Sequence, residues 1–142
     1  MKLKKSILTI CICLTFIIVT AIPVFANTKS WSSRMYLRHV DGKNNGKIYT
    51  MTDGDMTNNF NISVISKDKG ANSKPNTVTV YVYKNGFFTK NLGGKSIKPS
   101  SNIIKEAYKS YGTQPKGDYY LVISKPEDDG WNLKIEGTLI TK

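Results

Sequence analysis

The sequence predicts an all-β protein, an antiparallel β-sandwich of about seven strands with one short helix. Three observations lead to this prediction. Segments that alternate apolar and polar residues, rich in valine, threonine and aromatic residues, recur along residues 27–142. Polar clusters with glycine or proline separate these segments at short intervals. An apolar N-terminal segment of a different character precedes them. A small β-barrel is the second choice.

Residues 1–26 have the organisation of a cleaved secretory signal peptide. Lysines open the segment, an almost unbroken apolar run extends from Ile7 to Val19, and Val24 and Ala26 are small residues that signal peptidases accept. The apolar run is shorter than the roughly 20 residues that a membrane-spanning helix requires. We therefore expect cleavage after Ala26 and a secreted, extracellular protein. A retained membrane anchor is the alternative.

Cleavage would leave residues 27–142, a chain of 116 residues that suits a single domain. Both cysteines, Cys11 and Cys13, lie in the leader, so the mature chain is expected to have no disulfide and no thiol nucleophile. This absence, with many lysines and asparagines, favours a bacterial exported protein. The mature chain keeps 18 of the 21 lysines and arginines against 10 acids. A positive field attracts extracellular polyanions, but no run of five basic residues indicates specific nucleic-acid binding.

The first half of the mature chain predicts a hairpin and a further strand. Segments 34–40 and 47–52 flank the polar stretch 41–46, whose glycines and asparagines favour a turn. Residues 60–65 alternate apolar and polar side chains and are predicted to form the next strand. The polar stretch 67–76 contains a glycine and a proline, and we expect a loop there.

The clearest strand covers residues 77–83, where valines alternate with threonines and tyrosines. Asn85 and Gly86 follow, and this pair is preferred in two-residue hairpin turns because both positions need a positive φ. We therefore predict a hairpin whose returning strand begins at Phe87.

Residues 101–111 interrupt the strand pattern. Ile103, Ala107 and Tyr111 lie at helical spacing, and Asn102 suits an N-cap position. We expect one short helix here that covers a sheet edge.

The C-terminal part repeats the strand pattern. Residues 119–124 and 131–140 flank the polar turn 126–130, and the second segment alternates apolar and polar residues along most of its length. These segments predict a final hairpin, with a bulge or a close approach at Gly137.

Few residues in the mature chain suit hydrolytic chemistry. A small hydrolase or ribonuclease would use His39, the one histidine, with Glu106, Glu127 or Glu136 as its partner. No H-E-x-x-H, C-x-x-C or G-x-S-x-G motif occurs, which argues against zinc proteases, redox proteins and α/β-hydrolases. We therefore predict no enzymatic activity, no catalytic residue and no cofactor.

Two acidic clusters are weak candidates for a calcium site. Asp53 and Asp55 form one cluster, and Asp128 and Asp129 form the other. Each offers two carboxylates to a cation, and each equally suits a solvated turn. We expect no metal.

Aromatic residues are the best candidates for binding. Tyr81 and Tyr83 lie on the face of their strand opposite the valines, where their rings can stack on sugars. The alternative is that this face is buried by a second layer. Trp31 lies in a serine-rich segment, either as an exposed anchor or folded back on the sheet.

These features favour a secreted, non-enzymatic binding module for an extracellular anionic surface or glycan, that is, a cell-wall polymer or a membrane headgroup. A secreted bacteriocin or toxin-like effector is the first alternative. A small hydrolase or ribonuclease that uses His39 is the second. A structural or inhibitor protein that docks through a sheet edge is also open.

Three segments resemble the bacterial pre-peptidase C-terminal type of β-sandwich domain. They are the strand 77–83 with its Lys-Asn-Gly turn, the Gly-x-Tyr-Tyr strand 117–123, and the final strand 131–135 that begins with tryptophan. The resemblance covers residues 60–140 and implies a β-sandwich with a binding role. Such domains usually accompany secreted proteases, whereas this sequence shows no protease domain, so only the fold and the binding role carry over.

Overall fold

The structure is a computed structural model that describes residues 26–142. The predicted signal peptide lies outside the described residues, except for Ala26. The described elements are all strands, and they are β1 (Asn27–Met35), β2 (His39–Asp41), β3 (Tyr49–Met51), β4 (Gly54–Lys67), β5 (Val78–Lys84), β6 (Lys90–Ile97), β7 (Lys105–Gln114), β8 (Gly117–Ser124) and β9 (Trp131–Thr141). Among the residues described, no helix is long and apolar enough to cross a membrane.

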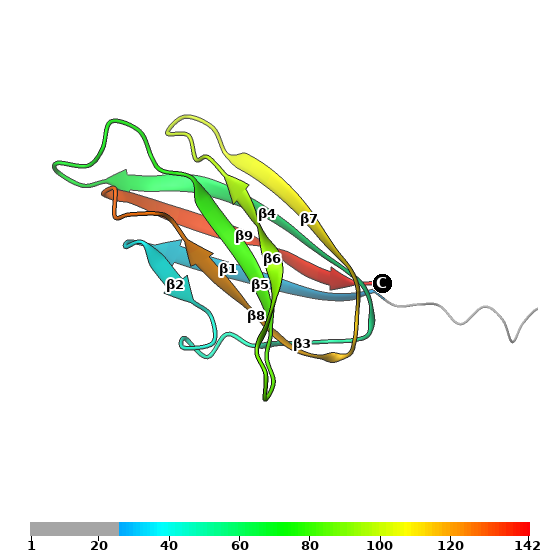
Figure 1. Cartoon of the computed structure of the whole chain (residues 1–142). Helices are drawn as coiled ribbons and strands as arrows, with labels where there is room; N and C mark the ends of the chain where they lie inside the picture. The colour runs from blue at the N-terminus through cyan, green and yellow to red at the C-terminus, as the bar shows by residue number, and fades with distance from the viewer. Residues whose placement is uncertain (1–25) are drawn as a thin grey trace, which may run out of the picture.

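Two antiparallel sheets pack face to face (Figure 1). The four-stranded sheet has the order β1-β9-β4-β7. The five-stranded sheet has the order β2-β8-β5-β6, and β3 also pairs with β8. The predicted all-β antiparallel sandwich is therefore confirmed, with nine strands in place of about seven.

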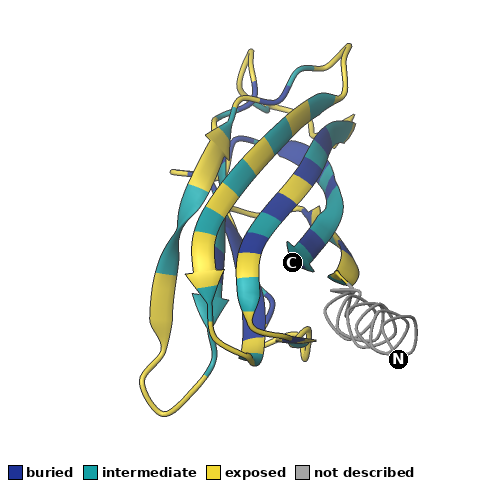
Figure 2. Ribbon diagram, turned by 90° about the vertical axis from the view of Figure 1, so that its right-hand side faces the viewer, coloured by how far each residue is buried: buried dark blue, intermediate teal, exposed yellow. Residues whose placement is uncertain are grey.

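One core lies between the two sheets. Val78, Val80 and Val82 of β5 are fully buried in it, as the alternation of residues 77–83 predicts. Apolar residues of β8 lie beside them in the same sheet, and apolar residues of β4 and β9 face them from the other sheet. Figure 2 shows how buried and exposed positions alternate along the strands. The outer faces of both sheets therefore carry the side chains that are available to partners.

Gly137 allows two aromatic rings to meet in this core. It lies between Trp31 of β1 and Phe60 of β4, and a Cβ at this position would come within 2.2 Å of the Asn59 carbonyl oxygen. The Trp31 and Phe60 rings pack with their centres 6.1 Å apart, and Trp31 Nε1 donates to Asn58 Oδ1 at 2.9 Å. Trp31 is therefore folded back on the sheet and buried, so it is no exposed anchor.

The prediction of a short helix at 101–111 is wrong. Residues 105–114 form β7, which pairs with β4 at the edge of the four-stranded sheet. Ala107 and Tyr111 turn toward the core while Tyr108 faces solvent, which is the period of a strand. The free edge of β4 offers a row of backbone partners, and this tertiary pairing overrides the helical spacing.

Two of the predicted hairpins do not form, because their strands pair with other strands. β2 and β3 both pair with β8 and not with each other. β8 and β9 belong to different sheets, so their connection crosses the sandwich. The hairpin of β5 and β6 does form, but Lys84 pairs with Lys90, and the loop therefore has five residues instead of two. The alternation of apolar and polar residues determines which face of a strand is buried, but it does not determine which strand pairs with it.

Candidate functional site

The predicted binding residues Tyr81 and Tyr83 lie on the outer face of the five-stranded sheet. Pairing of β5 with β8 places Tyr83 opposite Tyr120. The Tyr83 and Tyr120 rings stack with their centres 5.4 Å apart at an angle of 15°, and Tyr81 lies 6.4 Å from Tyr83. Tyr81 and Tyr83 are half-buried, whereas Tyr120 is buried. We call these three residues the tyrosine face.

Polar groups hold the tyrosine face in place. Asn91 Nδ2 donates to the Tyr83 hydroxyl at 3.1 Å, and the Lys43 ammonium lies 5.9 Å from the centre of the Tyr120 ring. Burial raises the pKa of the Tyr120 phenol. Gly94 lies opposite Tyr81 and leaves room for the tyrosine ring, because a Cβ at position 94 would lie 2.7 Å from Tyr81 Cδ1. The tyrosine face is therefore an ordered aromatic surface, and contacts within the protein cover much of the surface of its rings.

His39 lies on β2, at the border of this same sheet. Its neighbour Val40 points into the core, so His39 faces outward and is exposed. Glu106 and Glu136 lie on the outer face of the four-stranded sheet, on the opposite side of the sandwich. Glu127 accepts a hydrogen bond from an asparagine side chain of the loop before β5. The fold thus separates His39 from two of the three glutamates considered as its partners.

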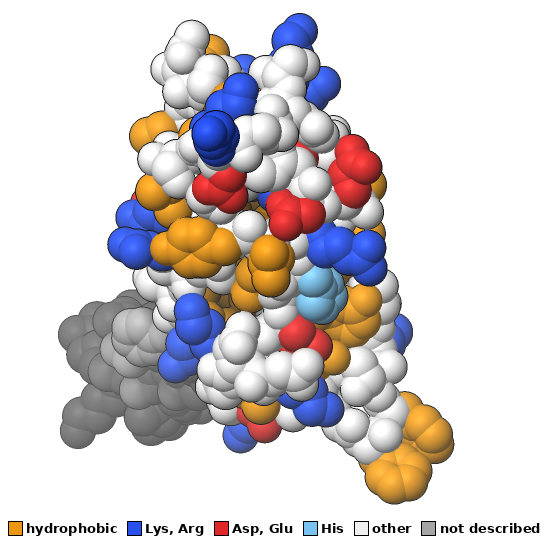
Figure 3. Space-filling view, turned by 90° about the vertical axis from the view of Figure 1, so that its left-hand side faces the viewer, with side chains coloured by type: hydrophobic (Ala, Val, Ile, Leu, Met, Phe, Trp, Pro, Cys, Tyr) orange, Lys and Arg blue, Asp and Glu red, His pale blue; other side chains and the backbone are white. Residues whose placement is uncertain are grey.

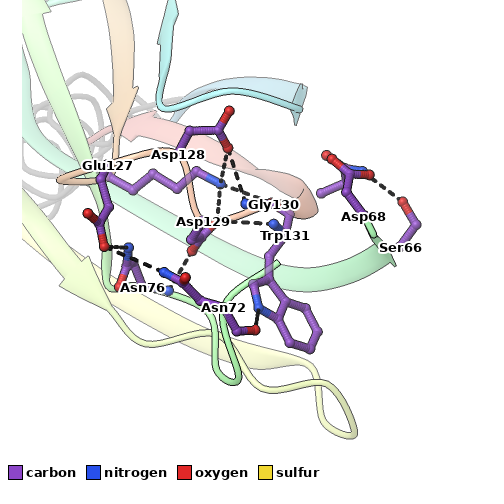
Figure 4. A network of polar contacts seen from close by, with 11 residues as sticks. Ser66, Asp68, Asn72, Asn76, Glu127, Asp128, Asp129, Gly130 and Trp131 are labelled. Carbon is purple, nitrogen blue, oxygen red and sulfur yellow. Dashed lines mark hydrogen bonds and ion pairs between the residues drawn. The ribbon is translucent and has the colours of Figure 1, made fainter. Parts of the chain in front are cut away.

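The acidic cluster at 128–129 is occupied by a lysine (Figure 4). Asp129 and Lys125 form an ion pair in which both side chains are fully buried. Asp129 also accepts from the backbone N–H groups of Asn76 at 2.6 Å and Trp131 at 3.1 Å. Burial acts to raise the pKa of the Asp129 carboxyl, but these donors together with Lys125 outweigh it and leave the pKa below its usual value. The cluster therefore holds two loops together, and the Lys125 ammonium is the cation that Asp129 binds.

The other acidic cluster is also used within the protein. Asp55 Oδ1 accepts a hydrogen bond from Thr113 Oγ1, and the Asp55 N–H donates to the Lys142 carbonyl oxygen at 2.8 Å. Asp53 is exposed beside it. Among residues 26–142, no three His, Cys, Asp or Glu side chains come together as a metal site.

The outer face of the four-stranded sheet carries a hollow of about 520 Å³ that the sequence did not single out. Two rows of side chains cross this face from β7 through β4 and β9 to β1. The first row consists of Glu106, Asn61, Glu136 and Ser32. The second row consists of Tyr108, Asn59, Thr138 and Ser30. A second hollow of about 460 Å³ shares Asn61, Glu136 and Thr138 and extends over β1. We call the two hollows together the polar groove.

Side-chain length explains why this face is hollow. Asn59 and Asn61 on the inner strand β4 are short, and longer side chains flank them, Tyr108 and Glu106 on β7 and Glu136 on β9. Glu106 and Glu136 lie two strand spacings apart, so their backbones are about 10 Å from each other. Tyr108 is 57% exposed at one side, and Glu136 pairs with Lys134 at 2.7 Å on the other. The groove offers one aromatic ring together with amide, hydroxyl and carboxylate groups.

The wrong helix prediction hid the side of this groove that β7 forms. In a helix, Glu106 and Tyr108 would have pointed in different directions and would have had no relation to β4. As strand residues, both face outward beside Asn59 and Asn61. The alternation of asparagines with Phe60 is the one sequence signal for the groove.

Comparisons with known proteins show only distant likeness. No family model matches the chain, and no curated protein matches it. The resemblance to pre-peptidase C-terminal domains therefore stays a prediction.

Among solved structures, tripeptidyl peptidase 2 matches 81% of the chain at 8% identity with a TM-score of 0.47. A chain of the infectious bursal disease virus Gx strain matches 81% of it at 8% identity with a TM-score of 0.48. The Yersinia pseudotuberculosis-derived mitogen matches 80% of the chain at 12% identity with a TM-score of 0.36, and the match covers 86% of the mitogen. The chain spans 10% of the peptidase and 32% of the viral chain. These likenesses carry no inference about function.

Proposed function

We propose that the protein is a secreted, non-enzymatic binding module that holds a cell-wall glycan in the polar groove. The observation that carries the proposal is the continuity of the two hollows across all four strands of one sheet face. Three strand spacings give this face a width of about 14 Å, which suits a short stretch of a polymer better than a single ion.

The chemistry of the lining supports a sugar ligand. Asn59 and Asn61 each offer a donor and an acceptor, and the hydroxyls of serine and threonine beside them do the same. Tyr108 provides a ring against which the apolar face of a sugar can pack. Glu106 and Glu136 favour neutral or amino sugars at the groove itself. Residues 27–142 contain 18 basic and 10 acidic residues, and this positive net charge attracts the protein to an anionic wall from a distance.

The test is binding of residues 27–142 to purified cell walls, measured by co-sedimentation. Tyr108→Ala and Asn61→Ala should each weaken binding by about tenfold, because the first removes the aromatic ring of the groove and the second removes an amide from its middle. Tyr36→Ala is the matched control, since Tyr36 is 50% exposed and lies outside the groove. It should bind as the unaltered protein does.

Three outcomes would change the proposal in different ways. Loss of binding in Tyr81→Ala/Tyr83→Ala, with Tyr108→Ala unaffected, would move the site to the tyrosine face and keep the function. Release of reducing ends from the walls that Glu106→Gln abolishes would show a glycosidase instead of a binding module. Absence of binding to any wall preparation would overturn the function itself.

A further inference from the structure

Phe87 and Phe88 form the apex of the loop between β5 and β6. They are 97% and 85% exposed, more than any other large apolar side chain described. Their rings contact each other edge to face, with centres 4.8 Å apart. The loop projects beyond the sandwich at the bottom of Figures 1 and 2, and an apolar knob marks the same level in Figure 3. Folding therefore leaves two phenylalanines in water, where they add nothing to the core.

Lysines surround the base of this loop. Lys84 and Lys90 are direct partners across β5 and β6, and like charges in this position repel each other. The Lys84 side chain passes over Gly117, since a Cβ at position 117 would lie 3.2 Å from Lys84 Cε. Lys116 precedes Gly117 in the chain. None of the three lysines forms an ion pair within residues 26–142. The carboxylate of Asp118 at this end accepts a hydrogen bond from a threonine hydroxyl.

We propose that this loop docks the protein on a lipid bilayer with anionic headgroups. Phe87 and Phe88 enter the boundary between headgroups and acyl chains, and the lysines at the base contact the phosphates above it. The contact uses residues outside the polar groove, and it goes beyond the proposed glycan function.

The shape and the order of charges favour a bilayer over a protein partner. The apex is convex and the phenylalanines line none of the hollows described above. A bilayer accepts such an apex without a preformed pocket. The apolar tip lies outermost and the lysines lie behind it. In an inserted protein the tip would therefore reach the acyl chains while the lysines lie at the level of the phosphates.

The test is sedimentation of residues 27–142 with vesicles. This part contains every strand and every core residue of the described range 26–142, so we expect it to fold without the apolar leader, which would itself bind lipid. We expect binding to vesicles of equal parts phosphatidylglycerol and phosphatidylcholine, little binding to phosphatidylcholine alone, and weaker binding in about 0.5 M salt. Phe87→Ser/Phe88→Ser should reduce the affinity by about tenfold or more. Lys84→Gln/Lys90→Gln should also reduce it by about tenfold.

The matched control is Ile103→Ser/Ile104→Ser, which alters another adjacent apolar pair that is 58% and 63% exposed. This variant should bind vesicles as the unaltered protein does. Tyr108→Ala should also bind them normally, so a failure of the glycan proposal and a failure of this one are distinguishable.

Insertion depth has its own readout. Phe88→Trp places a new tryptophan at the apex, while Trp31 and Trp131 are only 5% and 7% exposed. Its emission should shift to shorter wavelength on anionic vesicles. The proposal is overturned if Phe87→Ser/Phe88→Ser retains binding or if this emission does not shift. A dimer in the absence of lipid that the serine variant abolishes would also overturn it, because the phenylalanines would then form a contact between protein chains.

Discussion

Lys125 is an unusual cation for a small β-sandwich because its side chain is fully buried. It donates to Asp129 and, at 3.0 Å, to the Trp131 carbonyl oxygen. Lys125→Met would leave the Asp129 carboxylate buried beside an apolar group, which should destabilise the protein by about 3–5 kcal/mol in urea unfolding. The control is Lys134→Met, which breaks an exposed pair with Glu136 and should cost less than about 1 kcal/mol. Equal effects of the two substitutions would show that burial does not govern the Lys125 pair.

The same pair predicts a loss of stability in acid. The pKa of Asp129 is lowered in the folded protein, so its contribution to the free energy of unfolding is complete above the unfolded value of about 4. It is lost as the pH falls through the lower, folded pKa. We expect urea midpoints of the unaltered protein to approach those of Asp129→Asn as the pH is lowered from 6 toward about 2. A constant difference between the two proteins over this range would contradict the assignment.

At the scale of elements, local sequence patterns were sufficient to predict most strands but not to predict which strands pair with each other. The 77–83 segment shows its buried valines and its outward tyrosines directly in the sequence, and the structure places them so. β7 could not be predicted in this way, because its strand conformation depends on the edge of β4, whose paired residues lie 43 (Ile62 to Lys105) to 60 (Gly54 to Gln114) positions earlier in the chain.

The candidate sites follow the same division. Tyr81 and Tyr83 could be placed on one face by alternation, but Tyr120 joins them only through the pairing of β5 with β8. The polar groove depends on three such pairings, so no local pattern reveals it. The exposed phenylalanine pair was hidden for another reason. The Asn-Gly motif suggested a tight turn, whereas the longer loop ends at Lys84 and Lys90 and puts both rings at its apex.

At the scale of the whole molecule, the two sheets share one core, and residues 27–142 contain no cysteine that would link them covalently. Packing must therefore hold the sandwich together, with a net stability expected near the usual range of about 5–15 kcal/mol. A consequence is that neither sheet has a hydrophobic layer of its own. The Trp31 and Trp131 side chains of the four-stranded sheet lie in the same cluster as Val80 of the five-stranded sheet.

Unfolding should accordingly be a single cooperative transition that both sheets share. Val80→Ala removes two buried methyl groups from the five-stranded sheet and should cost about 2–3 kcal/mol. Tryptophan fluorescence reports on Trp31 and Trp131 in the other sheet, whereas far-UV circular dichroism reports on all strands. The substitution should lower the urea midpoint equally by both probes. If the fluorescence midpoint stayed in place while the dichroism midpoint fell, the sheets would unfold separately and the shared core would not be what couples them.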